Sequence, residues 1–117
     1  MNNYYCICIV ELLSMVICTN MTRNFEIVNS HYLFEGVDSK YIGGDFVVSH
    51  EVDVINQHSP ENITILASGK DIPCDLILIE NESKFKLLNT SSIGSFHGLN
   101  EKGFRKFITN FIDHSLR

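Results

Sequence analysis

The stretch ITILASGKDIPCDLILIENESKFKLLN, residues 63–89, carries most of the information about the fold. Its centre, CDLILIE (74–80), is a continuous apolar run of strand length, which is typical of a strand buried on both faces. The segment before it, ITILAS (63–68), is rich in β-branched residues, and the loop GKDIP separates the two. The stretch therefore predicts consecutive β-strands joined by short turns.

The last segment of this stretch, KFKLLN (84–89), alternates polar and apolar residues. Successive side chains of a strand point to opposite faces. We therefore expect Lys84 and Lys86 to face outward and Phe85 and Leu87 to face inward.

Two further strands are expected upstream, in IGGDFVVSH (42–50) and EVDVIN (51–56), and the Gly-Gly pair of the first indicates a bulge or a sharp bend. HYLF (31–34) before them fits a short helical turn or a lead-in strand. Five strands between Ile42 and Asn89, at intervals of about 8–12 residues, favour a small barrel or sandwich. We predict an all-β fold with an appended helix: a five-stranded OB-fold barrel followed by a C-terminal amphipathic α-helix. A pleckstrin-homology-like barrel needs more strands than the sequence offers and ranks second.

The C-terminal segment GLNEKGFRKFITNFIDHSLR (98–117) predicts an amphipathic helix over about residues 98–116. Asn100 is its candidate N-cap. Apolar residues recur at the spacing i, i+3, i+4, i+7 and i+8, which places five of them on one helix face. These five residues, called the apolar stripe below, are Phe104, Phe107, Ile108, Phe111 and Ile112.

The apolar stripe needs a surface to pack against, either the chain's own barrel or the helix of a partner. Each such side chain left in water would forgo roughly 1.5–3 kcal/mol of burial. Because five of them are a heavy load for a terminal helix on a small barrel, we expect a subunit interface with coiled-coil-like helical association. Packing against the chain's own core remains the alternative. Membrane binding is not expected, since the polar face has no basic excess.

The 117 residues are enough for a single domain with one hydrophobic core. With 14 acidic and 9 basic side chains, the formal net charge is −5. Tight nucleic-acid binders are usually basic, because phosphate neutralisation supplies most of their affinity. The charge therefore argues against a strong autonomous nucleic-acid binder.

Residues 1–20, MNNYYCICIVELLSMVICTN, form an apolar N-terminal extension ahead of the single OB-fold domain predicted for residues 21–117. No basic residue precedes the apolar run and Glu11 interrupts it, so it fits neither a typical signal peptide nor a spanning helix. It is either a signal-like segment or an extension upstream of a true start at Met21. Four N-x-S/T sequons leave secretion open: Asn20, Asn62, Asn81 and Asn89.

No residue pattern in the chain points to catalysis, a metal or a cofactor. The four cysteines and five histidines show no zinc-ligand spacing, and the Gly-Lys pair of ASGKD lacks the rest of a P-loop. Cys74 opens the most apolar run, where burial makes a thiol inert. We therefore expect a non-enzymatic protein with no cofactor and no metal, whose cysteines are free and buried.

A weak contact with single-stranded DNA is the other functional candidate. OB-folds bind single strands through aromatic side chains flanked by positive charge. The candidate contacts are the rings of Phe46 and Phe85, which lie on predicted strands, and the charges of Lys84 and Lys86, with Lys40 and Lys70 nearby in sequence. The acidic net charge favours the alternative that the rings face the barrel interior and the lysines are an ordinary solvated face, so any contact would be auxiliary.

The order of these elements resembles the smallest subunit of replication protein A, the eukaryotic single-strand DNA-binding heterotrimer. The resemblance is carried by KFKLLNTSSIG, which corresponds to the last strand and exit loop, and by LNEKGFRKFITNFI. FEIVNSHYLFEGVDSKYIGGDFV is similar to the family's lead-in and first strand. The resemblance covers about residues 24–113 and rests on element order and apolar pattern. Residues 1–20 have no counterpart, and Gly103 sits in the first helical turn, where it weakens helix propensity.

The resemblance implies a structural subunit of a nuclear single-strand DNA-binding complex that acts in DNA replication, repair and recombination. The apolar stripe would join one helix from each of two larger OB-fold subunits in a three-helix bundle, and DNA would be bound mainly by those partners. The competing hypothesis is a secreted, β-rich glycoprotein that acts as a host- or receptor-interaction factor. A third hypothesis is a small barrel that binds a lipid or peptide in a pocket, but no specific residue supports it.

Overall fold

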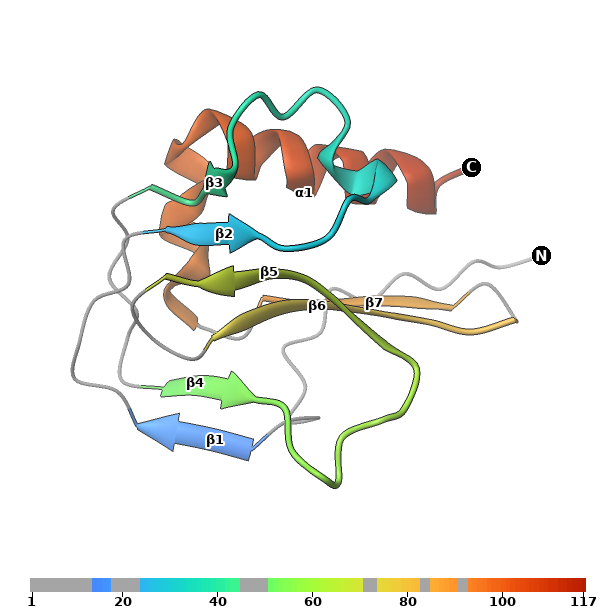
Figure 1. The fold of residues 1–117 in the computed structure, drawn as a ribbon. Coiled ribbons are helices and arrows are strands. Elements are labelled where there is room, and N and C mark those ends of the chain that lie inside the picture. Colours follow the sequence, from blue (N-terminus) through green and yellow to red (C-terminus); the bar gives the residue numbers. More distant parts are fainter. Residues whose placement is uncertain (1–13, 18–23, 45–50, 71–73, 83–84, 91–92) are drawn as a thin grey trace.

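The computed structural model describes residues 14–17, 24–44, 51–70, 74–82, 85–90 and 93–117. Its centre is a five-stranded antiparallel sheet with the strand order β3-β2-β5-β6-β7, and β1 pairs with β4 in a separate two-stranded sheet (Figure 1). The strands are β1 Ser14–Ile17, β2 Phe25–Ile27, β3 Tyr41–Ile42, β4 Glu51–Val54, β5 Ile63–Gly69, β6 Asp75–Glu80 and β7 Lys86–Asn89.

Three helical elements accompany the sheet: the 3-10 helices η1 Tyr32–Phe34 and η2 Ile93–Asn100, and the α-helix α1 Lys102–Ser115. Helix α1 runs beside β2 and β3, along the top of Figure 1, with η1 next to it. Its phenylalanines join the main core cluster together with Phe25 of β2 and Leu33 of η1. The helix therefore covers one face of the sheet.

Strand β6 is buried on both faces, as its apolar run predicts. Leu76 and Leu78 belong to the core cluster that includes the α1 phenylalanines, whereas Ile77 and Ile79 belong to a second cluster. All four side chains are at most 7% exposed. Because side chains alternate along a strand, these two sets lie on opposite faces of the sheet.

The start of α1 is fixed by Glu101 and not by Asn100, the predicted N-cap, which ends η2 instead. The Glu101 carboxylate accepts hydrogen bonds from the backbone N–H groups of Gly103 (2.8 Å) and Phe104 (2.6 Å). It also accepts one from Gly43 (3.0 Å), just after β3. Partial burial acts to raise the pKa of this carboxyl, but the backbone N–H donors outweigh it, so the pKa lies below its usual value.

Gly103 occupies a position where a side chain has no room. An added Cβ atom would lie 3.0 Å from Cγ2 of Ile42 and 3.0 Å from Oε1 of Glu101. The glycine weakens helix propensity, but it lets the first turn of α1 approach β3 closely.

The predicted antiparallel β domain with a C-terminal helix is confirmed, whereas the OB-fold barrel is not. In the part of the chain that the structure describes, β3 and β7 are the two edges of the sheet and do not pair with each other. Strand β3 has only 2 residues. Gly43 and Gly44 follow it with φ angles of 98° and 62°, so the Gly-Gly pair forms the expected bend.

Strands β1 and β2, near the N-terminus, were not predicted from the sequence. Residues 31–34 contain the expected helical turn, η1, but β2 just before it was not expected as a strand. Within the predicted extension 1–20, residues Ser14–Ile17 pair with β4 as strand β1. The rest of that extension lies outside the described residues.

Candidate nucleic-acid interface

The apolar stripe is buried against the chain's own sheet. Phe104, Phe107 and Phe111 are 2%, 0% and 4% exposed, and Ile108 packs at the edge of the same core cluster. Of the five stripe residues, Ile112 is the one exposed to solvent, at 42%. The apolar stripe therefore packs against the chain's own core, which was the alternative prediction. The three phenylalanines are not on a surface that a partner helix could reach.

Asn110 ties the same helix to the loop after β2. Its amide Nδ2 donates to the carbonyl oxygens of Leu33 (2.9 Å) and Glu35 (2.8 Å), and the residue is 6% exposed. Buried polar groups are almost always hydrogen-bonded, and this one satisfies two backbone acceptors at once. The sequence pattern did not single out Asn110, because one asparagine in an amphipathic helix looks the same whether it is clamped or solvated.

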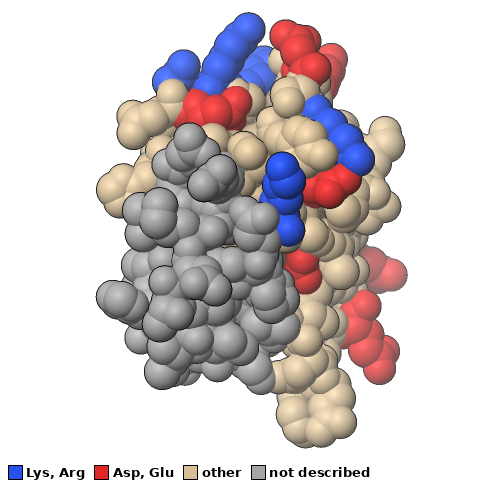
Figure 2. All heavy atoms as spheres, turned by 60° about the vertical axis from the view of Figure 1, so that its left-hand side comes forward, with Lys and Arg blue, Asp and Glu red and all other residues tan. Residues whose placement is uncertain are grey.

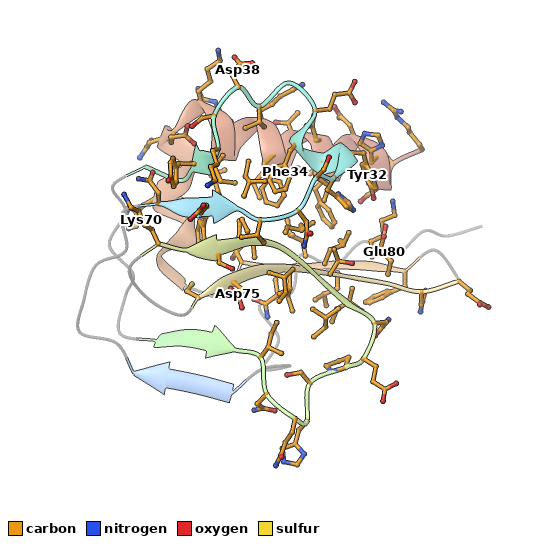
Figure 3. The ribbon with its side chains drawn as sticks, viewed as in Figure 1. Tyr32, Phe34, Asp38, Lys70, Asp75 and Glu80 are labelled. Atoms are coloured by element: carbon orange, nitrogen blue, oxygen red, sulfur yellow. The ribbon has the colours of Figure 1, made fainter. Side chains whose placement is uncertain are left out.

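Lys86, a predicted single-strand contact, is held by partners within the chain. Its ammonium donates to the Tyr32 hydroxyl (3.1 Å) and lies 3.5 Å from the Glu80 carboxylate. The Tyr32 hydroxyl donates in turn to Glu80 (3.0 Å), and Figure 3 shows these two residues side by side. Partial burial acts to lower the pKa of the Lys86 ammonium, but Tyr32 and Glu80 raise it above its ordinary value. Lys86 therefore has a structural role here.

The other predicted contacts do not gather into a site. Phe46 and Lys84 lie outside the described residues. Phe85, expected to face inward, is 39% exposed, because β7 begins only at the next residue, Lys86. Leu87 and Leu88 of this strand are both buried, in the core clusters on opposite faces of the sheet.

Two histidines pack on Tyr32, with ring centroids 4.2 Å away for His31 and 4.6 Å away for His114. His31 also caps η1, because its Nδ1 accepts the Leu33 N–H (3.3 Å). Burial lowers the pKa of His31; the Glu80 carboxylate opposes this shift, and Lys86 and His114 add to it. This group joins η1, β6 and β7 to the last turn of α1.

A different group of side chains does present an aromatic ring with positive charge to solvent. Tyr41, on the edge strand β3, is 37% exposed. The ammonium groups of Lys40 and Lys70 lie 5.9 Å and 5.4 Å from the centre of its ring, within the range of a cation–π interaction. We call these three residues the Tyr41 platform.

The Tyr41 platform is assembled by strand pairing. Strand β2 lies between β3 and β5, and its residue Phe25 is opposite both Ile42 and Gly69. Tyr41 precedes Ile42 and Lys70 follows Gly69, so residues far apart in sequence meet at one edge of the sheet. The sequence predicts Lys40 and Lys70 only as neighbours of strands, because the strand register that brings them to Tyr41 depends on long-range pairing.

The charges around the Tyr41 platform are mixed. Lys40 forms a salt bridge with Glu26 of β2. Among the described residues, Lys70 forms no salt bridge, so its charge is available to a ligand. Figure 2 shows Lys and Arg side chains spread over the upper part of this side of the molecule, with Asp and Glu between them. The surface suits a weak anion contact better than a tight one.

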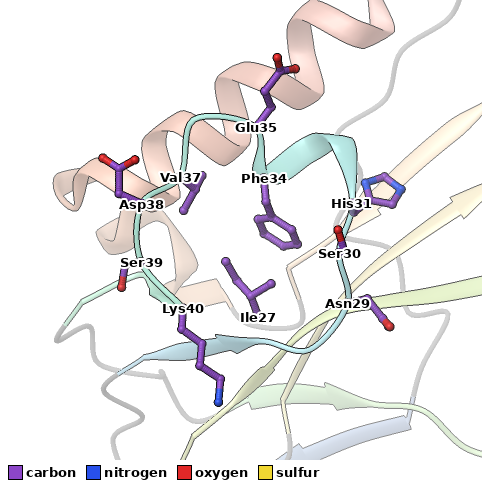
Figure 4. A pocket seen from close by; sticks show the side chains of 10 residues that line it. All are labelled: Ile27, Asn29, Ser30, His31, Phe34, Glu35, Val37, Asp38, Ser39 and Lys40. Atoms are coloured by element: carbon purple, nitrogen blue, oxygen red, sulfur yellow. The ribbon is translucent and has the colours of Figure 1, made fainter.

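A pocket of about 530 Å³ opens beside the platform, inside the loop that connects β2 to β3. The loop runs as a ring around it, and Figure 4 shows the side chains of Ile27, Phe34 and Val37 directed into that ring. The carboxylates of Glu35 and Asp38 are directed away from it. Phe34 is held in place by stacking on Phe107, with ring centroids 5.2 Å apart.

The sequon asparagines differ in accessibility. Asn62 and Asn81 are exposed, whereas Asn89 is 2% exposed at the end of β7. Asn20 lies outside the described residues. Two of the four sequons are therefore on the surface of the folded chain.

Within the described residues, no group of three or more His, Cys, Asp and Glu side chains could hold a metal ion. None of the helices found there is long and apolar enough to cross a membrane. Cys74 is buried, as expected, whereas Cys6, Cys8 and Cys18 lie outside the described residues.

Comparison with known proteins returns no match: no family model, no curated protein and no solved structure is significantly similar to the chain. Its surfaces have to be judged on their own geometry.

Proposed function

We propose that the chain is a non-enzymatic subunit that contacts single-stranded nucleic acid through the Tyr41 platform. The observation that carries the proposal is the exposed Tyr41 ring, with the ammonium groups of Lys40 and Lys70 within 5.9 Å and 5.4 Å of its centre. An exposed aromatic ring provides a stacking surface for any base, and the flanking lysines attract the phosphates. The contact is therefore tolerant of sequence.

The electrostatics make this contact auxiliary. The net charge of −5 repels a polyanion at long range. One of the two platform lysines is already paired with Glu26. A single free ammonium and one ring cannot supply tight binding alone, so most of the affinity for the strand belongs to partner subunits.

The finer form of the proposal follows the resemblance to the smallest subunit of replication protein A. In that form the chain is an OB-fold subunit of a nuclear complex for DNA replication, repair and recombination, bound to two larger OB-fold subunits. Its partner surface is then the exposed margin of α1, formed by Ile112 and by Leu116, the residue that caps the end of the helix; they are 42% and 67% exposed. The buried phenylalanines of the apolar stripe hold the helix in place beneath that margin.

Strand binding is tested by fluorescence anisotropy with a labelled oligothymidylate at low ionic strength. Tyr41→Ala should weaken binding by roughly tenfold, because stacking of one base on an aromatic ring contributes about 1–3 kcal/mol. Phe85→Ala is the matched control, since it removes a ring of similar exposure, 39% against 37%, from the β6–β7 turn. Equal affinities of the two variants would remove the platform from the proposal.

Assembly is tested separately by coexpression with candidate OB-fold subunits. Ile112→Glu combined with Leu116→Glu should abolish copurification, because two charges would face an apolar partner surface. Thr109→Glu, at an exposed position of the same helix, should leave copurification intact. If the double variant still copurifies, the margin of α1 is not the assembly surface.

A secreted glycoprotein is the second proposal, and the exposure of Asn62 and Asn81 is what supports it. Mass spectrometry of the protein from its natural source separates the two proposals. Glycan on either asparagine, together with a cleaved N-terminus near residue 20, would end the nuclear proposal. A start at Met1 or Met21 without glycan would end the secreted one.

A further inference from the structure

The pocket inside the β2–β3 loop lies directly next to the Tyr41 platform. Lys40 lines the pocket and also flanks the Tyr41 ring. Tyr41 is the next residue along the chain, and consecutive Cα atoms are about 3.8 Å apart. Lys40 is therefore shared by the platform and the lining of the pocket, and the two lie next to each other.

The residues that line the pocket suit a planar aromatic ring linked to a phosphate group. Its inner wall consists of the apolar side chains of Ile27, Phe34 and Val37, all partly buried and packed against the core. The Phe34 ring is fixed by its neighbour Phe107, with an angle of 18° between the ring planes. A rigid aromatic side chain in an apolar recess offers a stacking surface without a large loss of side-chain entropy.

Positive charge borders the pocket from two elements. Lys40 comes from the loop itself, but its ammonium is paired with Glu26 and its side chain is directed away from the ring (Figure 4). The Lys106 side chain of α1 lies over Gly36 of the ring, where an added Cβ atom would be 3.0 Å from its Cε. The Lys102 ammonium lies 3.9 Å from the Asp38 carboxylate and offsets its charge. With the carboxylates of Glu35 and Asp38 directed away from the ring (Figure 4), the pocket can accept a phosphate-linked group.

We infer that this pocket is a subsite for a single nucleobase of the strand that stacks on Tyr41. The inference rests on the proposed function and adds to it a second, adjacent base position with Phe34 as its stacking surface. A volume of about 530 Å³ lies in the range of pockets that hold small ligands. The exposed hydroxyl group of Ser30 on the rim is available for hydrogen bonds to the base or to the sugar, and that of Ser39, which accepts the Tyr41 N–H (3.1 Å), can still donate one.

Photocrosslinking tests the subsite on the intact wild-type chain. Oligothymidylate with 5-iodouracil substitutions is irradiated with the protein, and crosslinked peptides are identified by mass spectrometry after trypsin. Cleavage after Lys40 separates a peptide with Phe34 from one with Tyr41. Crosslinks to both rings support the subsite and the platform together. A crosslink to Phe34 without Tyr41 overturns the platform, and with it a subsite for the strand that stacks on Tyr41.

The remaining outcomes separate failure of the subsite from failure of the proposed function. A crosslink to Tyr41 without one to Phe34 overturns the subsite and leaves the proposed function standing. Absence of any strand binding overturns both.

A matched pair of variants provides an independent measurement. Val37→Glu places a carboxylate in the pocket and should weaken oligothymidylate binding by roughly tenfold. Val28→Glu makes the same chemical change at a residue that is 49% exposed and does not line the pocket, so it should change affinity far less. Circular dichroism establishes that each variant is folded. Equal affinities of two folded variants would overturn the subsite.

Discussion

The ring of Phe34 stacks on the ring of Phe107, with centroids 5.2 Å apart and an angle of 18° between the planes. Phe107 belongs to α1 and Phe34 to the loop between β2 and β3, so this contact joins the terminal helix to the wall of the pocket. The helix is therefore part of the core, and it also supports the surface that we propose to bind a base.

The first prediction concerns the burial of the apolar stripe. Phe107→Ala should lower the free energy of unfolding by about 3–5 kcal/mol, because a large side chain is removed from a packed core. Ile112→Ala, on the exposed margin of the same helix, should lower it by much less. Urea unfolding of the isolated chain measures both. Similar, small effects would mean that the helix does not pack on its own sheet.

The second prediction concerns the Asn110 clamp. Asn110→Ala should lower the free energy of unfolding by about 1–3 kcal/mol, since it leaves the carbonyl groups of Leu33 and Glu35 without their donor. Hydrogen exchange should quicken in η1, which the clamp holds. The exposed neighbour Thr109 serves as control, and Thr109→Ala should leave exchange in η1 unchanged. Unaltered protection of η1 in Asn110→Ala would contradict the clamp.

The third prediction concerns the carboxylate that starts α1. Glu101→Gln at neutral pH should lower the free energy of unfolding by about 0.5–2 kcal/mol, as expected for loss of an N-cap. The folded-state pKa of Glu101 lies below 4.5, so its stabilising effect is present above that pH and is lost as the pH falls through the folded-state pKa. Unfolding measured at about pH 7 and about pH 3 should therefore show a difference between wild type and variant that shrinks at the acidic pH. A difference that is independent of pH would argue against an ionised cap.

The fourth prediction concerns His31. Burial lowers its pKa below 6.5, so the unfolded chain binds the proton more readily, and stability should fall as the pH drops through that value. Protonation also removes the Nδ1 acceptor for the Leu33 N–H. His31→Asn keeps a capping oxygen without a titrating group. Its stability should depend less on pH than that of wild type between about pH 7 and about pH 5. Parallel pH profiles would be evidence against this role.

The local residue pattern predicted the strand that is apolar along its whole length. It did not predict the elements whose formation depends on contacts with residues distant in sequence. The run in β6 is apolar at every position that the core needs, so its burial followed from the sequence. Strand β2 spans three residues, and its identity depends on pairing with β5, which is distant in sequence. Glu101 starts α1 in place of Asn100 because its carboxylate also reaches Gly43, 58 residues away.

The candidate site was harder to foresee for the same reason. Lys86 is a basic residue of the kind that contacts single-stranded DNA, but its ammonium group is bound to Tyr32 and Glu80 within the chain. Tyr41 could not be predicted as part of a site, because Lys70 is brought next to it only by the pairing of β2 with β3 and with β5. The apolar stripe is buried because the sheet has an apolar face for it to pack against. The spacing of apolar residues in the helix does not reveal whether such a face exists.

The most direct measurement is the salt dependence of oligothymidylate binding for wild type, Lys70→Glu and Arg117→Glu. The two variants change charge equally, but Arg117 lies at the C-terminus, on the opposite side of Figure 1 from β3. We expect Lys70→Glu to weaken binding and to reduce the slope of log K against log salt by about 0.7, the value for one phosphate contact on a single strand. Arg117→Glu should keep the wild-type slope. Equal affinities and slopes for both variants, or a wild-type chain that does not bind the strand, would contradict a nucleic-acid contact at the Tyr41 platform.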